Sequence, residues 1–312
     1  MSTDVCVVIA SRDLPRLSGL YDRLMQLPEN GKLFFMGDAD VGRMVSEYET
    51  TKDAGFINEN DIIPFDSVHA LMKERLSPYL KGAELPRGVT GWYYQQFLKM
   101  EYAAHCSNDW YLVWDGDTIP CRKISMFSEN GEPYFDLKHE HKPEYFETME
   151  RLLPGVGKVI GRSFISEHML IKREYMLELI EEIEQNESIP GNAFWEKILN
   201  SIPAEKIQEA VFSEFETYGS FVAVRHQSAY RLRSWHSFRL GGEFFDPATI
   251  CDRDFEWLGR DFDAISFEKG HFVREDHKNL FDNPRYQEKL SPRKMLETVQ
   301  EVFQDGYIEV WD

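Results

Sequence analysis

Residues 110–118 read Trp-Tyr-Leu-Val-Trp-Asp-Gly-Asp-Thr. The first five form a continuous apolar run, the pattern of a strand that is buried on both faces. The run ends abruptly at Asp115-Gly116-Asp117, and alternate residues of an extended backbone point the same way, so both carboxylates can face one crevice. Ligands of open parallel sheets bind in the crevice at the carboxyl ends of the strands. We therefore expect a ligand site at the end of this strand.

The paired carboxylates of this motif predict a divalent cation. Like charges held close together are unfavourable unless a cation neutralises them, and hard carboxylate oxygens suit Mg²⁺ or Mn²⁺. Gly116 removes a side chain between the two acids, which lets a metal or ligand approach the backbone. The alternative is that Asp-Gly-Asp-Thr is only a polar turn, but the buried run before it favours a site.

The segments on either side of this strand alternate between short apolar runs and amphipathic stretches. Apolar runs predict strands, and periodic stripes predict helices. The expected strands cover residues 5–10, 33–36, 62–65, 110–114, 132–137 and 158–164. The expected helices cover residues 17–27, 68–76, 91–104, 169–183, 194–202 and 295–303, and residues 225–245 are expected to be extended. This alternation predicts an α/β fold with a mostly parallel sheet flanked by helices.

The composition is typical of a cytoplasmic globular protein. The chain has 312 residues, 42% of them hydrophobic, enough for one large α/β domain. Its net charge of −19 repels nucleic acid and anionic headgroups, so we expect no nucleic-acid partner. The four cysteines are scattered, no run approaches the ~20 apolar residues of a membrane span, and the N-terminus does not resemble a signal peptide. We therefore expect no stable membrane insertion.

Three segments of the chain resemble a known family. Residues 91–99 (Gly-Trp-Tyr-Tyr-Gln-Gln-Phe-Leu-Lys), 111–118 and 213–219 (Ser-Glu-Phe-Glu-Thr-Tyr-Gly) are similar to a little-characterised bacterial family of glycosyltransferases from cell-surface polysaccharide clusters. The order of buried strand, Asp-x-Asp motif and Pro120 resembles the GT-A fold. The likeness covers about residues 3–270 in the order of elements. Trp114 departs from the pattern, because many GT-A enzymes carry a smaller apolar residue there.

The resemblance implies a fold and a reaction. The fold would be a GT-A, Rossmann-like domain of residues 1–270, with an α+β C-terminal elaboration whose helical extension, residues 271–312, packs on the same domain. The reaction would be a Mn²⁺- or Mg²⁺-dependent transfer, with inversion, of a sugar from a nucleoside diphosphate sugar to a hydroxyl group of a glycan or lipid-linked glycan. It would serve bacterial polysaccharide synthesis in the cytoplasm, or peripherally at the inner membrane face.

The resemblance also implies roles for residues that bind the donor. Ala10, Ser11 and Arg12 would line the base and ribose. Gln95 and Lys99 lie four positions apart on one helix face, so they could point into the crevice together. Lys99 would neutralise a phosphate or brace the first aspartate of the motif; the alternative is a solvated helix lysine.

A third set of implied roles concerns the metal. Asp117 would be the main metal ligand, and Asp115 would contact the ribose or a water bound to the metal. A histidine far downstream would complete the metal site. We take His271 as this ligand, although His226 and His236 are alternatives that the sequence does not rank.

The acidic cluster at residues 212–219 is the candidate for the base that deprotonates the acceptor. Glu214 and Glu216 lie among aromatic residues, and a carboxylate in a partly dry environment has a raised pKa and becomes a better base. The alternative is a capping box in which Ser213 caps a helix and Glu216 occupies its third position, which favours Glu214 as the base. His168, at an expected helix start, could contact the donor sugar or acceptor, or be structural.

Two further features leave alternatives open. The most basic stretch could receive a diphosphate or pair with the abundant carboxylates; it contains Arg225, Arg231, Arg233 and Arg239. A nucleotidyltransferase would also use carboxylates and Mg²⁺, but the loop after the first strand, residues 10–15, lacks the glycines of a phosphate loop. A scaffold protein that kept the fold and lost the chemistry is the non-enzymatic alternative.

Overall fold

The computed structural model describes residues 2–275, 277 and 280–298. Its centre is a sheet of five strands: β1 (Thr3–Val8), β2 (Leu33–Gly37), β3 (Gly55–Asn58), β4 (Trp110–Asp115) and β7 (His168–Lys172). The strand order is β3-β2-β1-β4-β7. The first four strands run parallel, and β7 pairs antiparallel with β4. The predicted mostly parallel α/β sheet is confirmed.

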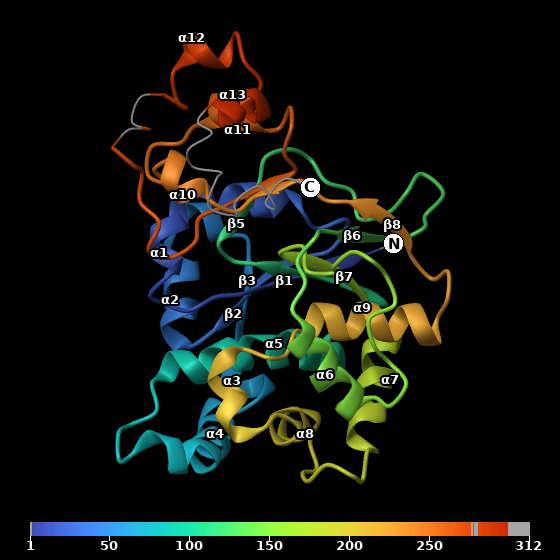
Figure 1. Cartoon of the computed structure of the whole chain (residues 1–312). Coiled ribbons are helices and arrows are strands. Elements are labelled where there is room, and N and C mark those ends of the chain that lie inside the picture. The colour runs from blue at the N-terminus through green and yellow to red at the C-terminus, as the bar shows by residue number, and fades with distance from the viewer. Residues whose placement is uncertain (1, 276, 278–279, 299–312) are drawn as a thin grey trace.

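Helices cover both faces of this sheet (Figure 1). One face is covered by α3 (Glu59–Ile62), α4 (Phe65–Leu80), α5 (Arg87–His105), α6 (Pro143–Leu152), α7 (Arg173–Glu184), α8 (Phe194–Ser201), η3 (Ala204–Glu209) and α9 (Glu214–Arg225). The other face is covered by α1 (Leu14–Leu17), η1 (Ser18–Gln26), α2 (Ala39–Glu47) and η2 (Glu49–Thr51).

Further short elements follow β4 in the chain, and Figure 1 shows most of them gathered above the sheet. A three-stranded sheet has the order β5 (Thr118–Pro120), β10 (Ala264–Ser266), β9 (Ser237–Phe238), and β6 (Tyr134–Leu137) pairs in parallel with β8 (Arg231–Ser234). The helices are α10 (Gly241–Phe244), α11 (Asp252–Leu258), α12 (Pro284–Gln287) and α13 (Pro292–Thr298). Residues 299–312, including the end of the expected helix 295–303, lie outside the described residues.

The two faces of the sheet are packed into two separate apolar cores. Tyr111 and Val113 of β4 belong to the core under α5, whereas Leu112 and Trp114 belong to the core under α1 and the C-terminal elements. Successive strand residues point to opposite faces, so a strand covered on both sides must be apolar throughout. This requirement explains the unbroken apolar run of residues 110–114.

Several element predictions are wrong. Residues 62–65, expected as a strand, end α3 and begin α4, and the third parallel strand is β3. Residues 158–164 form no strand and contribute only a bridge between Lys138 and Ser163. The expected helix 169–183 is split, because its first residues form β7 and only Arg173 onwards is helical. Residues 225–245 hold two short strands and a helical turn, not one extended segment.

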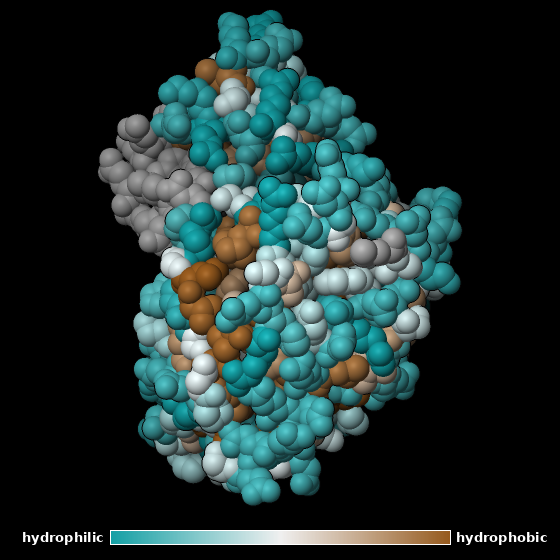
Figure 2. Space-filling view, turned by 90° about the vertical axis from the view of Figure 1, so that its right-hand side faces the viewer, coloured by the Kyte–Doolittle hydropathy of each residue, from teal (hydrophilic) through white to brown (hydrophobic). Residues whose placement is uncertain are grey.

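The surface is predominantly polar. On the face shown in Figure 2, hydrophilic residues dominate and a narrow hydrophobic band crosses them. Among the described residues, no helix is both long and apolar enough to cross a membrane.

The half-buried carboxylate of Glu101 makes the free energy of unfolding depend on pH. Half-buried Glu101 of α5 has its pKa raised from 4.5 to about 7, first by burial and then by the charge of Glu184 at the end of α7. Between pH 4.5 and 7 the unfolded chain releases a proton that the folded chain keeps, so stability falls as pH rises through this window. We expect Glu101→Gln to raise the midpoint of thermal unfolding by roughly 2–4 °C at pH 8 and much less at pH 5.

Differential scanning calorimetry at both pH values measures this effect. The matched control is Glu187→Gln, which removes an exposed carboxylate and should leave both midpoints unchanged. An equal shift for Glu101→Gln at pH 5 and pH 8 would contradict the assignment.

Candidate active site

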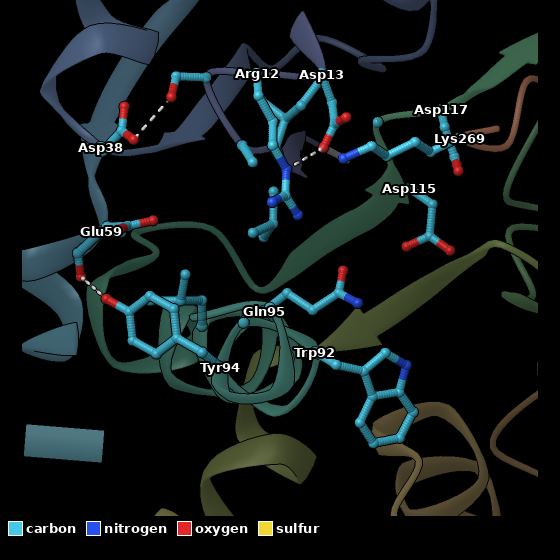
Figure 3. A pocket seen from close by; sticks show the side chains of 18 of the residues that line it. Arg12, Asp13, Asp38, Glu59, Trp92, Tyr94, Gln95, Asp115, Asp117 and Lys269 are labelled. Carbon is cyan, nitrogen blue, oxygen red and sulfur yellow. Dashed lines mark hydrogen bonds and ion pairs between the residues drawn. The ribbon is translucent and has the colours of Figure 1, made fainter. Parts of the chain in front are cut away.

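A cleft of about 570 Å³ opens at the carboxyl ends of the parallel strands. It lies where the strand order reverses, because β1 has β2 on one side and β4 on the other. Ligands of open α/β sheets bind at such switch points. The lining comes from the ends of β1, β2 and β4, from the first turns of α5 and from the loop after β10; Figure 3 labels Arg12, Asp13, Asp38, Glu59, Trp92, Tyr94, Gln95, Asp115, Asp117 and Lys269 among its residues.

The two aspartates of the motif lie in this cleft on a turn that the protein holds firmly. The Trp114 indole donates a hydrogen bond to the carbonyl of Thr118 at 2.7 Å, which closes the turn and accounts for the large residue at this position. A Cβ atom at Gly116 would lie 3.0 Å from the side chain of Ile9 and 3.2 Å from Val7. The glycine is therefore needed for packing against β1 as well as for ligand access.

The backbone beside the motif is strained. Glu167 has a φ of 61°, in the left-handed region that non-glycine residues rarely occupy, and its carbonyl accepts the Asp115 N–H at 2.9 Å. Its buried carboxylate accepts hydrogen bonds from Lys138 at 2.9 Å, Trp235 at 3.0 Å and Ser237 at 2.8 Å. These contacts hold the strained conformation in place, as such conformations require. Sequence analysis missed Glu167, because its partners are distant in sequence.

Lys99 is buried behind the first aspartate of the motif. Its side chain is 3% exposed, and its ammonium lies 2.6 Å from Asp115 Oδ1 and 2.8 Å from Glu214 Oε1. Burial favours the neutral amine, but the two carboxylates outweigh it and raise the pKa of Lys99. Lys99 therefore braces Asp115, ties α5 to β4 and α9, and is not a solvated lysine.

The second aspartate of the motif has no such partner. Within the described part of the chain, no basic side chain forms an ion pair with Asp117. Its pKa is raised to about 7, first by burial and then by the charges of Asp115 and Glu268, while Arg239 and Arg16 oppose the shift. Asp117 is therefore the carboxylate of the motif that remains available to a cation.

The two carboxylates fit the predicted metal. Mg²⁺ is commonly held by one or two carboxylates and takes its other ligands from phosphates and water. The described residues contain no cluster of three or more His, Cys, Asp or Glu side chains suited to a metal. His271 is not among the residues that line the cleft; it packs against Gly242, and its Nδ1 is buried without a hydrogen-bond partner in the described structure. His271 as third ligand stays a prediction.

Four of the five predicted donor-binding residues of the first loop and of α5 line the cleft, whereas Lys99 is buried behind it. The four that line the cleft are Ala10, Ser11, Arg12 and Gln95, and the Ser11 hydroxyl donates to Asp38 at 3.0 Å. Sequence analysis did not select several other lining residues, namely Asp13, Arg16, Asp38, Glu59, Arg87, Trp92, Tyr94 and Lys269. Asp38 directly follows β2. The rule that ligands bind at the carboxyl ends of parallel strands, which predicted the site at residues 115–117, could therefore also have predicted Asp38.

Five predicted site residues are not among those that line the cleft: Lys99, His168, Glu214, Glu216 and His271. Glu214 is buried against Lys99, and the Glu216 carboxylate accepts from the Ser163 hydroxyl and the Phe164 N–H. Ser213 does cap α9 by accepting the Glu216 N–H at 3.3 Å, so half of the capping box forms. The role of the two glutamates as acceptor base stays a prediction, and their contacts give both a positioning role.

His168 opens β7, not a helix, and is 1% exposed. Its Nε2 lies 2.9 Å from Asp136 Oδ2 and its Nδ1 lies 2.8 Å from the Ser166 carbonyl, so both nitrogens are occupied within the protein. These contacts fit the structural alternative for His168.

The four arginines of the basic stretch pair with carboxylates. The ion pairs join Arg225 to Glu182, Arg231 to Glu132, Arg233 to Asp136, and Arg239 to Glu268. None of the four is among the described residues that line the cleft. The basic side chains that do line the cleft are Arg12, Arg16, Arg87 and Lys269.

A family model, described as a family of unknown function (DUF6492), matches residues 12–306. The chain belongs to this family. No curated protein matches the DUF6492 chain.

Solved structures similar to this DUF6492 member include the galactosyltransferase LgtC in complex with donor and acceptor sugar analogues (11% identity, TM-score 0.40, covering 85% of this chain and 87% of that chain). They also include apo mouse xyloside xylosyltransferase 1 (9% identity, TM-score 0.37, covering 87% and 99%). A third is the glycosyltransferase GlyE of Streptococcus pneumoniae TIGR4 (10% identity, TM-score 0.31, covering 75% and 45%).

The bracing role of Lys99 in this DUF6492 member predicts a large effect on stability. Lys99→Met leaves Glu214 and Asp115 without their shared partner, and removing one member of a buried ion pair costs about 3–5 kcal/mol. The double variant Lys99→Met/Glu214→Gln removes the buried unpaired charge and should recover part of this loss. Urea unfolding followed by circular dichroism, in EDTA, measures both, and Glu214→Gln alone is the control. A Lys99→Met loss below about 1 kcal/mol would contradict the bracing role.

Proposed function

We propose that this protein transfers a sugar from a nucleoside diphosphate sugar to a hydroxyl group of a glycan or lipid-linked glycan, with the help of Mn²⁺ or Mg²⁺. One observation carries the proposal: Asp115 and Asp117 line a cleft of about 570 Å³ at the switch point of a parallel sheet, and the loop of Ala10 to Arg12 lines the same cleft. This position suits a nucleotide. The resemblance of residues 91–99, 111–118 and 213–219 to glycosyltransferases supports the same conclusion.

In the proposed function, different residues around the cleft bind the metal, the diphosphate and the nucleoside. Asp117, with Asp115 beside it, would hold the metal, which when bound stabilises negative charge on the leaving diphosphate as a Lewis acid. Lys99 keeps Asp115 in place from the protein interior. The guanidinium of Arg16 donates to the Phe267 carbonyl at 2.6 Å, which fixes a positive charge at the cleft beside the diphosphate. Ser11 and Arg12 face the nucleoside.

The proposed reaction is a substitution at the anomeric carbon of the donor sugar. The acceptor oxygen forms a bond to this carbon as the bond from the carbon to the diphosphate oxygen breaks. The diphosphate leaves with the electron pair, and the hydroxyl proton passes to a base. Glu214 and Glu216 are both engaged with protein groups outside the cleft, so the inverting outcome and its base stay predictions.

The cellular role follows from the resemblance. We propose that the protein works in bacterial surface polysaccharide synthesis, in the cytoplasm or attached peripherally to the inner face of the membrane. A lipid-linked acceptor would bring it there without a membrane span of its own.

Metal-dependent nucleotide binding tests the proposal. We expect one nucleoside diphosphate or its sugar derivative to stabilise the protein in Mn²⁺ but not in EDTA, by about 2.7 kcal/mol at a hundred times its dissociation constant. Asp117→Asn should weaken this binding at least about tenfold, because it removes the unpaired carboxylate from the cleft. Thermal unfolding against a panel of nucleoside diphosphates, triphosphates and nucleotide sugars measures the effect.

The matched control is Asp53→Asn, which removes an exposed aspartate outside the cleft and should bind as the unsubstituted protein does. Preference for triphosphates over nucleotide sugars would favour a nucleotidyltransferase. Absence of any nucleotide binding would refute the proposal and favour the scaffold alternative.

A further inference from the structure

The wall of the cleft formed by α5 has a feature that the roles above do not explain. Seven residues of α5 line the cleft, and four of them, Gly88, Gly91, Trp92 and Gln95, follow one another at helical spacing. Residues three and four positions apart on a helix are neighbours, so these four share one face. Figure 3 shows the Trp92 indole and the Gln95 amide on this helix, across the cleft from Arg12, and Asp115 lines the same cleft.

The two glycines on this face have no packing role. A Cβ atom built at Gly88 or Gly91 would meet no described atom within 4 Å apart from the adjoining backbone of α5, so no neighbouring element requires either glycine. Glycine inside a helix costs roughly 0.5–1 kcal/mol relative to alanine. What the missing side chains leave open is space in the cleft along the helix backbone.

The two larger side chains of this face, Trp92 and Gln95, keep their polar atoms free of partners among the described residues. The Trp92 indole packs edge-on against Tyr93, with ring centroids 4.8 Å apart, and the Tyr93 hydroxyl is itself anchored on the Ile207 carbonyl at 2.7 Å. In the part of the chain that the structure describes, the Trp92 indole nitrogen and the Gln95 amide have no hydrogen-bond partner. Both side chains are partly exposed. Their free donors and acceptor are therefore directed to whatever fills the cleft.

We propose that Trp92 and Gln95 form the subsite for a sugar ring at the reacting end of the cleft. A pyranose ring presents one face of C–H groups and an edge of hydroxyl groups. The C–H face suits the electron-rich face of an indole, and the hydroxyl edge suits an amide that both donates and accepts. The open space at Gly88 and Gly91 lets the ring lie close to the helix.

The place of this subsite distinguishes a sugar from a nucleobase, which could also stack on an indole. The inference rests on the proposed function, in which the nucleoside lies at Ala10 to Arg12 and the diphosphate lies at the two aspartates of the motif. The group on the other side of the diphosphate from the nucleoside is then the sugar. The α5 face borders that position. The ring belongs to the donor or to the acceptor, and binding measurements separate the two.

Calorimetric titration of the full chain in Mn²⁺ tests the donor arm. The ligands are UDP and GDP, together with UDP-glucose, UDP-N-acetylglucosamine and GDP-mannose. We expect Trp92→Ala to weaken binding of the recognised nucleotide sugar roughly tenfold and to leave its bare nucleoside diphosphate within about twofold. Trp92→Phe keeps an aromatic face and should retain most of the affinity, and Gln95→Ala should weaken the nucleotide sugar alone.

Saturation-transfer NMR with methyl glycosides of glucose, galactose and mannose, on the protein with Mn²⁺ and the bare diphosphate, tests the acceptor arm. A signal lost in Trp92→Ala, with nucleotide-sugar affinity unchanged, assigns the ring to the acceptor. The matched control is Tyr79→Ala, an exposed aromatic outside the cleft, which should change neither arm.

Three results would overturn the inference. Equal losses for the nucleotide sugar and the bare diphosphate would make Trp92 a platform for the base. No change in either arm would remove the subsite and leave the proposed function intact. Failure of the unsubstituted protein to bind any nucleotide would overturn the proposed function and this inference together.

Discussion

The parallel pairing of β1 with β4 is the constraint on which the site depends. In its register Val7 lies beside Trp114 and Val8 beside Asp115, so both strands end at the same level. The loop after β1 and the motif after β4 consequently border one cleft. Both strands are buried on two faces, and a slip of one residue would turn Trp114 from one core into the other, so packing holds the register tightly.

Sequence periodicity predicted the elements that lie at the centre of this arrangement. β1, β2, β4 and α5 carry unambiguous patterns, because strands covered on both sides must be apolar throughout and a long helix must bury a stripe. The sequence pattern did not predict β3, because this strand, Gly55–Asn58, is short, lies at the edge of the sheet and has mostly partly exposed residues. β7 was not predicted because the apolar residues of β7 (His168–Lys172) and of α7 together fit a helical spacing, for example Met169, Met176, Ile180 and Ile183, so strand and helix gave one amphipathic pattern.

The same distinction separates the site residues that could be predicted from the sequence from those that could not. Residues that directly follow a central strand, such as Ser11, Asp115 and Asp117, could be predicted because the strand itself aims them at the cleft. The places of Glu214 and His168 could not be predicted in this way. Glu214 is placed by the packing of α9 against α5, and His168 by a hydrogen bond to Asp136 on another strand. Such tertiary contacts leave no periodic signal in one sequence.

The two aspartates of the motif have different surroundings. This difference affects how an acidic protein can bind an anion in the cleft. Lys99, which also pairs with Glu214, partly compensates the charge of Asp115 from the interior. Burial and the neighbouring carboxylates disfavour the ionised form of Asp117. A bound divalent cation would offset both effects, because its charge favours the ionised carboxylate. Under the proposed function, a diphosphate that arrives with a cation would meet Arg12, Arg16 and Lys269 in a cleft whose negative charge the cation reduces. Without the cation, the same diphosphate faces Asp117 and a chain of net charge −19, so binding of cation and diphosphate should be mutually reinforcing.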